Sequence, residues 1–204
     1  MQRYGLKLLA LLFVVFASAN VYASEVQYDV GGGYAYFSGD PNKSLAPNTG
    51  YLVRFGAEAG RKTILKWTSN LTLAYSSSTS TFIDAGSFPS LSYTLVEGEF
   101  NLGFKLEFLA AYDKLPVQPY VGATGSIGST SFKFAQDAAV SATFPKTDAE
   151  NFYGYAIFVG VDISFTNYWG MGIEVEQSAT TGTVAKQPFS LNSNRVFLNL
   201  FFQP

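Results

Sequence analysis

The sequence of 204 residues contains no cysteine and no histidine. Without cysteine, the chain cannot form a disulfide scaffold or carry a lipid on an N-terminal cysteine. Without histidine, it cannot build a Ser-His-Asp or Cys-His catalytic group, nor a zinc site with histidine ligands. These absences exclude several classes of enzyme and metalloprotein. The sequence predicts neither a metal site nor a bound cofactor.

Long apolar runs and dense charge are also missing. After residue 23, no stretch is continuously apolar over anything near the roughly 18 residues of a transmembrane helix. Charged residues make up only 14% of the chain, with 13 basic and 15 acidic side chains. Because no basic block is present, the sequence predicts no nucleic-acid partner.

The first 23 residues have the layout of a secretory signal peptide. Positive charge at Arg3 and Lys7 precedes an apolar run at 8–16, and small residues offer a cleavage site after Ala23. The apolar run is too short to span a bilayer, although a buried N-terminal helix is the alternative interpretation. We expect residues 1–23 to be removed and residues 24–204 to form one domain.

Aromatic residues and glycine are abundant, with 19 Phe, 13 Tyr and 19 Gly, and they recur in alternating patterns. The clearest pattern covers residues 96–108, where every second residue from Phe100 to Phe108 is apolar and the positions between them are mostly polar or charged. Successive side chains of a strand point to opposite faces. This segment therefore predicts a long strand with one apolar and one charged face.

The same alternation predicts eight strands, near residues 26–37, 50–59, 64–76, 92–109, 117–132, 151–165, 169–179 and 193–203. The connections after the first, third, fifth and seventh strands are long and polar, whereas the others are short. This arrangement is typical of an up-and-down antiparallel meander with one end facing the exterior of a cell. The register of residues 117–134 stays open because glycines interrupt the pattern.

Two kinds of barrel fit this alternation. A soluble, lipocalin-like barrel has its apolar face inside, whereas a membrane barrel turns apolar residues to lipid and polar residues to its lumen. The membrane barrel is favoured because aromatic residues lie on the apolar face near strand ends, as lipid interfaces require. These predicted interface aromatics are Tyr51, Trp67, Tyr75, Tyr153 and Trp169. The predicted fold is all-β: an eight-stranded antiparallel up-and-down transmembrane β-barrel.

Three stretches carry a family resemblance. "LPVQPYVGATGSIG", "GYAIFVGVDISFTNYWGMGIEVE" and the terminal "RVFLNLFF" are similar to the small eight-stranded barrels of the bacterial outer membrane, the OmpA-, OmpX- and OmpW-like group. The resemblance implies an outer-membrane location, with membrane lipid and lipopolysaccharide as surroundings. It also implies that the aromatic Phe202 on the last strand serves as a signal to the barrel assembly machinery, although Gln203 and Pro204 follow it.

The polar face of the predicted barrel defines the candidate site. Its charged members are Asp29, Arg54, Glu58, Glu97, Glu99, Lys105, Glu107, Asp162, Glu174, Glu176 and Arg195. They have two interpretations: an ion-pair network that fills the lumen, or a narrow acidic path for cations or small polar solutes. Pairs such as Glu97 and Glu99 resemble the carboxylates of glycosidases, but alternation alone produces that spacing. We therefore predict no enzymatic activity.

Three functional hypotheses remain open. The first is a structural or surface-interaction role through four extracellular loops, whose apolar residues include Phe82, Phe88 and Phe144 and offer a surface for an external ligand or partner. The second is a narrow pore or lateral channel for small molecules. The third is a soluble periplasmic barrel that binds an apolar ligand inside.

Overall fold

The structure is a computed structural model that describes residues 26–38, 49–60, 64–80, 91–108, 116–134, 147–184, 187–190 and 192–204. Its strands are β1 (Val26–Ser38), β2 (Thr49–Ala59), β3 (Leu65–Ser80), β4 (Leu91–Glu107), β5 (Val117–Phe134), β6 (Thr147–Ser164), β7 (Trp169–Val184), β8 (Gln187–Ser190) and β9 (Asn192–Phe202). None of the described residues belongs to a helix long and apolar enough to cross a membrane. The predicted signal peptide lies outside the described residues.

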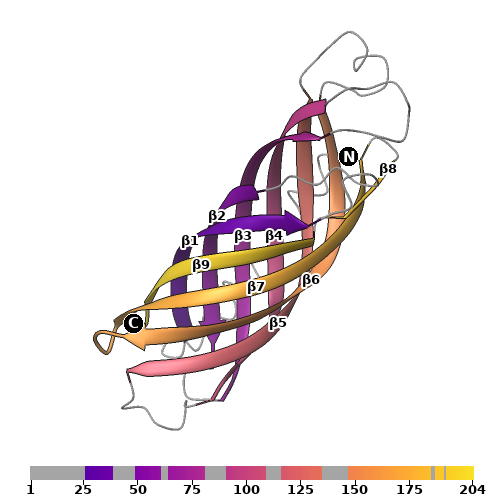
Figure 1. Cartoon of the computed structure of the whole chain (residues 1–204). Coiled ribbons are helices and arrows are strands. Elements are labelled where there is room, and N and C mark those ends of the chain that lie inside the picture. Colours follow the sequence, from indigo (N-terminus) through magenta and orange to yellow (C-terminus); the bar gives the residue numbers. More distant parts are fainter. Residues whose placement is uncertain are drawn as a thin grey trace.

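The strands form one closed antiparallel sheet. Each strand from β1 to β7 pairs with the next, and β9 pairs with both β7 and β1. Figure 1 shows β9 lying between these two strands, where it closes the wall of an elongated barrel. β8 pairs with the end of β7 in the same register as β9, so the two segments form one barrel strand. The predicted eight-stranded antiparallel barrel is thus confirmed.

The strands are inclined to the barrel axis. Following hydrogen-bonded partners once around the wall, from Tyr36 through Asn194 and onward, leads back to β1 at Val26, ten positions away (36 − 26). A displacement of this size in an eight-stranded barrel corresponds to a tilt of about 35–45°. Neighbouring residues in one hydrogen-bonded row therefore lie at different depths along the axis.

The apolar face of the sheet points outward. Leu102, Phe104 and Leu106 on β4 are 53%, 47% and 42% exposed, whereas Glu97 and Glu99 on the same strand are almost completely buried. This distribution is the reverse of a water-soluble protein and matches a barrel whose wall faces lipid. The alternative of a soluble barrel with an apolar interior is therefore wrong, because the interior is lined with charge.

The two ends of the barrel differ, as the connection lengths indicate. One end carries the short turns, such as the β6–β7 turn, where the Thr166 hydroxyl accepts hydrogen bonds from the Tyr168 and Trp169 amides. The opposite end carries the segments 39–48, 81–90 and 135–146, which lie outside the described residues together with most of the predicted apolar loop residues. The predicted fourth long loop is wrong, because β7 continues to Val184 and pairs with β8.

The register of residues 117–134, which the sequence left open, follows from the pairing of β5 with β4 and β6. Tyr120, Thr124, Ser126 and Thr130 are buried, and all four occupy the even-numbered positions that face the lumen. Gly122 and Gly128 occupy the same face, where a Cβ would lie 2.2 Å from the Phe158 ring and 2.3 Å from the Phe152 ring. These glycines thus make room for aromatic side chains of β6.

Candidate functional site

The charged residues of the predicted lumen lie on the inner face of the wall. Nine of the eleven are buried, and the half-buried ones are Asp29 and Glu58. They come from β1, β2, β4, β6, β7 and β9, so that the closed sheet brings together side chains that are far apart in the sequence. We describe them as three connected groups around Arg195, Arg54 and Lys105.

Arg195 on β9 is the centre of the first group. Its Nη1 atom donates hydrogen bonds to Glu99 Oε2 at 2.6 Å and to Glu176 Oε1 at 3.1 Å, and its Nη2 atom donates to Glu97 Oε1 at 3.2 Å. Its Nε atom donates to the Ser193 hydroxyl at 2.9 Å. One fully buried guanidinium thus joins carboxylates from β4 and β7 across the barrel.

Arg54 on β2 forms the second group. Its guanidinium donates hydrogen bonds to Glu174 and, at 3.3 Å, to Glu176 Oε2. The carboxylate of Glu176 therefore bridges Arg54 and Arg195. The guanidinium carbon of Arg54 also lies 3.4 Å from the centre of the Phe197 ring, a cation–π contact from β9.

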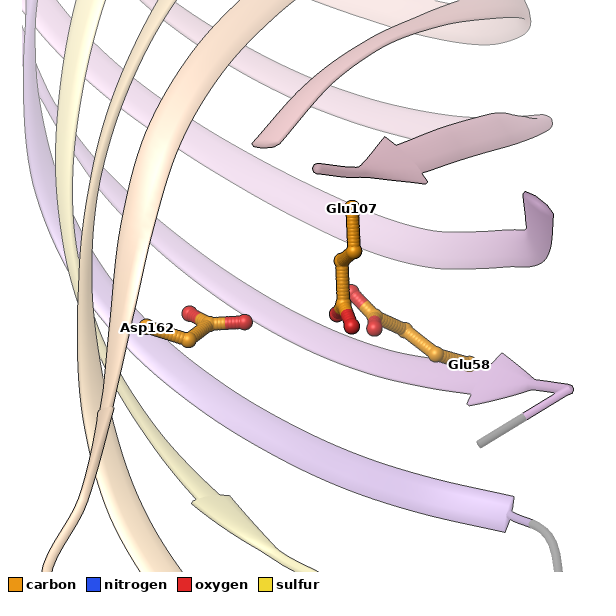
Figure 2. Close-up of side chains that lie close together, drawn as sticks. All are labelled: Glu58, Glu107 and Asp162. Atoms are coloured by element: carbon orange, nitrogen blue, oxygen red, sulfur yellow. The ribbon is translucent and has the colours of Figure 1, made fainter. Parts of the chain in front are cut away.

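Lys105 on β4 forms the third group. Its ammonium lies 2.9 Å from both carboxylate oxygens of Glu58, 2.7 Å from Asp162 Oδ2 and 3.4 Å from Glu107 Oε1. Figure 2 shows the carboxylates of Glu58 and Glu107 side by side, with that of Asp162 directed toward them. Their oxygens lie within 4.8 Å of one another, which is close enough to hold a metal ion. Here the chain supplies the positive charge itself, through Lys105.

The sequence interpretation missed one charged residue of the lumen. Lys66 on β3 is buried, and its ammonium lies 2.5 Å from Glu107 Oε1. Its position has the same parity as the polar residues Thr68 and Asn70, which are also buried, so the alternation contained the signal. With Lys66 included, the side chains that the structure describes on the inner face comprise eight carboxylates and four basic groups, so that four of these carboxylates are in excess (8 − 4).

Little space remains between these groups. The cavity bounded by Asp29, Arg54, Lys105 and Glu174 has a volume of about 20 Å³. A single water molecule requires roughly 10–15 Å³ by this measure. Nearer the loop end, the buried side chains are large and apolar, among them Phe37, Leu52, Leu95 and Phe152. Where its lining residues are described, the lumen is therefore filled by side chains, as expected for a barrel of eight strands.

The predicted interface aromatics lie on the outer face in two bands. Trp67 and Trp169 are at the turn end, where their rings contact Phe104 and Phe202 at centroid distances of 5.4 and 4.7 Å. Tyr51, Tyr75 and Tyr153 are nearer the loop end and are 71%, 52% and 70% exposed. Aromatic residues at both interfaces are characteristic of membrane barrels. Their anchoring role and the assembly role of Phe202 stay predictions.

Comparison with known proteins supports the fold. No protein-family model and no curated protein sequence matches the chain. The chain is similar in structure to Neisserial surface protein A, with a TM-score of 0.57 and 14% identity, over 88% of this chain and 97% of that one. It is also similar to the outer-membrane protein OprG from Pseudomonas aeruginosa, with a TM-score of 0.53 and 10% identity, over 88% and 96% of the two chains.

These similarities confirm the predicted fold, that of a small eight-stranded outer-membrane barrel. The exposed apolar wall independently requires a lipid environment, because so large an apolar surface is not stable in water. Fold and outer wall together describe a barrel whose wall is embedded in lipid.

Proposed function

We propose that this protein is a closed outer-membrane barrel with a structural or surface-interaction role, exerted through its extracellular end. The observation that carries this proposal is the filled lumen, whose cavity around Arg54 and Lys105 has a volume of only about 20 Å³. A solute that crossed the barrel would have to displace the buried ion pairs of Arg54, Lys105 and Arg195. Removing one partner from such a pair costs about 3–5 kcal/mol.

The proposal includes no catalytic role. Glu97 and Glu99, the carboxylates spaced like those of a glycosidase, are at most 1% exposed, and both accept hydrogen bonds from Arg195. A substrate would have no access to them in this arrangement. The proposed partners are membrane lipid and lipopolysaccharide around the wall, the barrel assembly machinery during insertion, and an external ligand at the loops.

A narrow cation path is the second candidate. Two observations favour it: the excess of carboxylates in the lumen, and the oxygens Glu97 Oε2 and Glu99 Oε1, which accept no hydrogen bond from the described residues. Carboxylate oxygens without a donor attract cations. This candidate requires that the ion pairs rearrange to open a path.

Single-channel recording in a planar bilayer distinguishes the two candidates. We expect the refolded protein to be silent, both as the wild type and as the Glu97→Gln/Glu99→Gln variant. Folding of each sample is checked by the change in gel mobility on boiling. Discrete conductance steps with a cation selectivity that falls in the variant would contradict the closed-barrel proposal and establish the lumen as a pore.

A further inference from the structure

A groove crosses the outer wall of the barrel over β6, β7 and β9. Its volume is about 290 Å³, near the lower limit of roughly 300 Å³ for small-molecule sites. The residues that line it include Tyr155, Ala179, and the carboxamides Gln177, Asn192 and Asn194. The described residues that line it include no charged side chain.

The outer face changes character at this groove. Nearer the turn end, the outward residues of β7 and β9 are aliphatic, and Val175 and Val196 are each about half exposed to the surroundings. One outward position further toward the loop end, β7 carries Gln177 and β9 carries Asn194, and these two residues are register partners. The outward side chains thus change from aliphatic at the pair Val175 and Val196 to carboxamide at the next outward pair, Gln177 and Asn194.

These carboxamides are exposed, and no hydrogen bond joins the side chain of Gln177 or Asn194 to another described residue. An amide turned toward lipid without a partner costs several kcal/mol. Asn194 is the register partner of Tyr36, and the exposed Tyr36 and Tyr155 belong to the tyrosine band of the loop end. Tyrosines of this kind mark the level of lipid headgroups. Lipid headgroups at this level carry the donors and acceptors that the side chains of Gln177 and Asn194 lack among the described residues.

We infer that this groove binds the saccharide headgroup of a glycolipid in the outer leaflet. A carboxamide both donates and accepts hydrogen bonds, so Gln177 and Asn194 complement the hydroxyl and amide groups of a sugar. The ring of Tyr155 offers an apolar face beside them, and the small side chain of Ala179 leaves room for the sugar. The absence of lysine and arginine from the described lining favours a neutral sugar over a phosphate.

This site lies on the lipid-facing wall, so the inference rests on the proposed function for its lipid surroundings and deepens it by assigning one glycolipid to a defined groove. It holds whether or not the lumen conducts. The sugar belongs to a membrane lipid in this proposal, because the groove opens at the level of headgroups and not at the tips of the loops.

The test is native mass spectrometry of the refolded protein in detergent, titrated with a diacyl glycolipid whose headgroup is a neutral hexose oligosaccharide. Phosphatidylglycerol and the free oligosaccharide without acyl chains are titrated in parallel. The variants are Asn194→Leu and Gln177→Leu, with Asn151→Leu as a matched control, since Asn151 is exposed on β6 but does not line the groove. Tyr155→Ala is a second groove variant, for use if a leucine variant fails to show the gel shift of a folded barrel.

We expect the wild type and Asn151→Leu to bind one glycolipid with the same affinity. Each groove variant should bind about tenfold more weakly, the effect of losing one or two hydrogen bonds. Equal binding by the wild type and the groove variants would overturn the inference. So would preferential binding of phosphatidylglycerol or of the free oligosaccharide, or a wild-type dimer that Asn194→Leu abolishes without any change in glycolipid binding.

Discussion

Gly33 on β1 determines how closely two strands of the lumen wall can approach. A Cβ at this position would lie 2.5 Å from the carbonyl oxygen of Val196 and 2.7 Å from the Phe197 ring. That ring supports the guanidinium of Arg54. Because Gly33 has no side chain, the Phe197 ring can lie against β1 and contact Arg54. Gly33 thus helps to position the ion pair between Arg54 and Glu174.

The neighbouring glycine provides a matched comparison. We expect Gly33→Ala to lower the free energy of unfolding by about 1–3 kcal/mol, because backbone and ring must both shift. Gly32→Ala should change it by less than about 0.5 kcal/mol, since a Cβ at Gly32 meets nothing within 4 Å. Urea unfolding in lipid vesicles, followed by tryptophan fluorescence, measures both. Equal effects of the two substitutions would contradict the contact argument.

At the scale of elements, β9 is tied to the turn that precedes β7. Phe202 packs against Trp169, and the amide of Gln203 donates a hydrogen bond of 2.8 Å to the carbonyl oxygen of Tyr168. β9 also pairs with β1 along its whole length, so it completes the wall on both sides. An unpaired strand edge is not tolerated in lipid, and closure by β9 is the step that removes the last edge.

The predicted assembly signal can be separated from this packing role. In cells, we expect Phe202→Ala to reduce the amount of folded barrel in the outer membrane several-fold. Leu200→Ala should have a smaller effect, although Leu200 lies on the same outward face and is 52% exposed. The boiling-dependent gel shift of isolated outer membranes measures the folded amount.

Refolding of the purified variants into lipid vesicles, without any machinery, completes this test. If Phe202 acts as a recognition signal, Phe202→Ala should refold in vitro with a yield similar to that of Leu200→Ala. An equal deficit of Phe202→Ala in cells and in vitro would instead assign the effect to lost contact with Trp169.

Strand alternation predicted most elements because the two faces of this wall differ so strongly. On β4, Glu97 and Glu99 occupy odd positions whereas Leu102 and Leu106 occupy even ones, and the structure places the two pairs on opposite sides of the wall. The end of β7 was missed because residues 180–184, Thr-Thr-Gly-Thr-Val, lack apolar alternation. In that region the outward positions no longer face hydrocarbon, so their polarity resembles that of a loop.

At the scale of the whole molecule, the sequence indicates which side chains enter the lumen but not which of them meet. Arg54 and Glu174 are 120 residues apart in sequence and become partners across the barrel. Their meeting depends on the displacement of ten positions around the wall, which sets the relative depth of every strand. Inward and outward side chains alternate with a period of two residues whatever the displacement around the wall. The alternation therefore does not indicate which inward side chains become partners.

The same network makes stability a property of the closed barrel as a whole. Arg195 is the clearest point at which to test this, because it contacts Glu97, Glu99 and Glu176 while being fully buried. Arg195→Met should lower the free energy of unfolding by about 3–5 kcal/mol, since three carboxylates lose their shared cation. Methionine keeps the unbranched apolar stem of arginine, so the packing around that stem changes little.

The physical cause can be isolated by removing the stranded charges as well. Adding Glu97→Gln and Glu99→Gln to Arg195→Met should restore part of the lost stability, because neutral amides are less costly to bury without a cation. The same two changes in the wild-type background should be destabilising, since they deprive Arg195 of its partners. Urea unfolding in vesicles gives all four values of a double-mutant cycle. Additive effects would mean that the Arg195 group is not an energetically coupled network, and that shape alone holds the lumen closed.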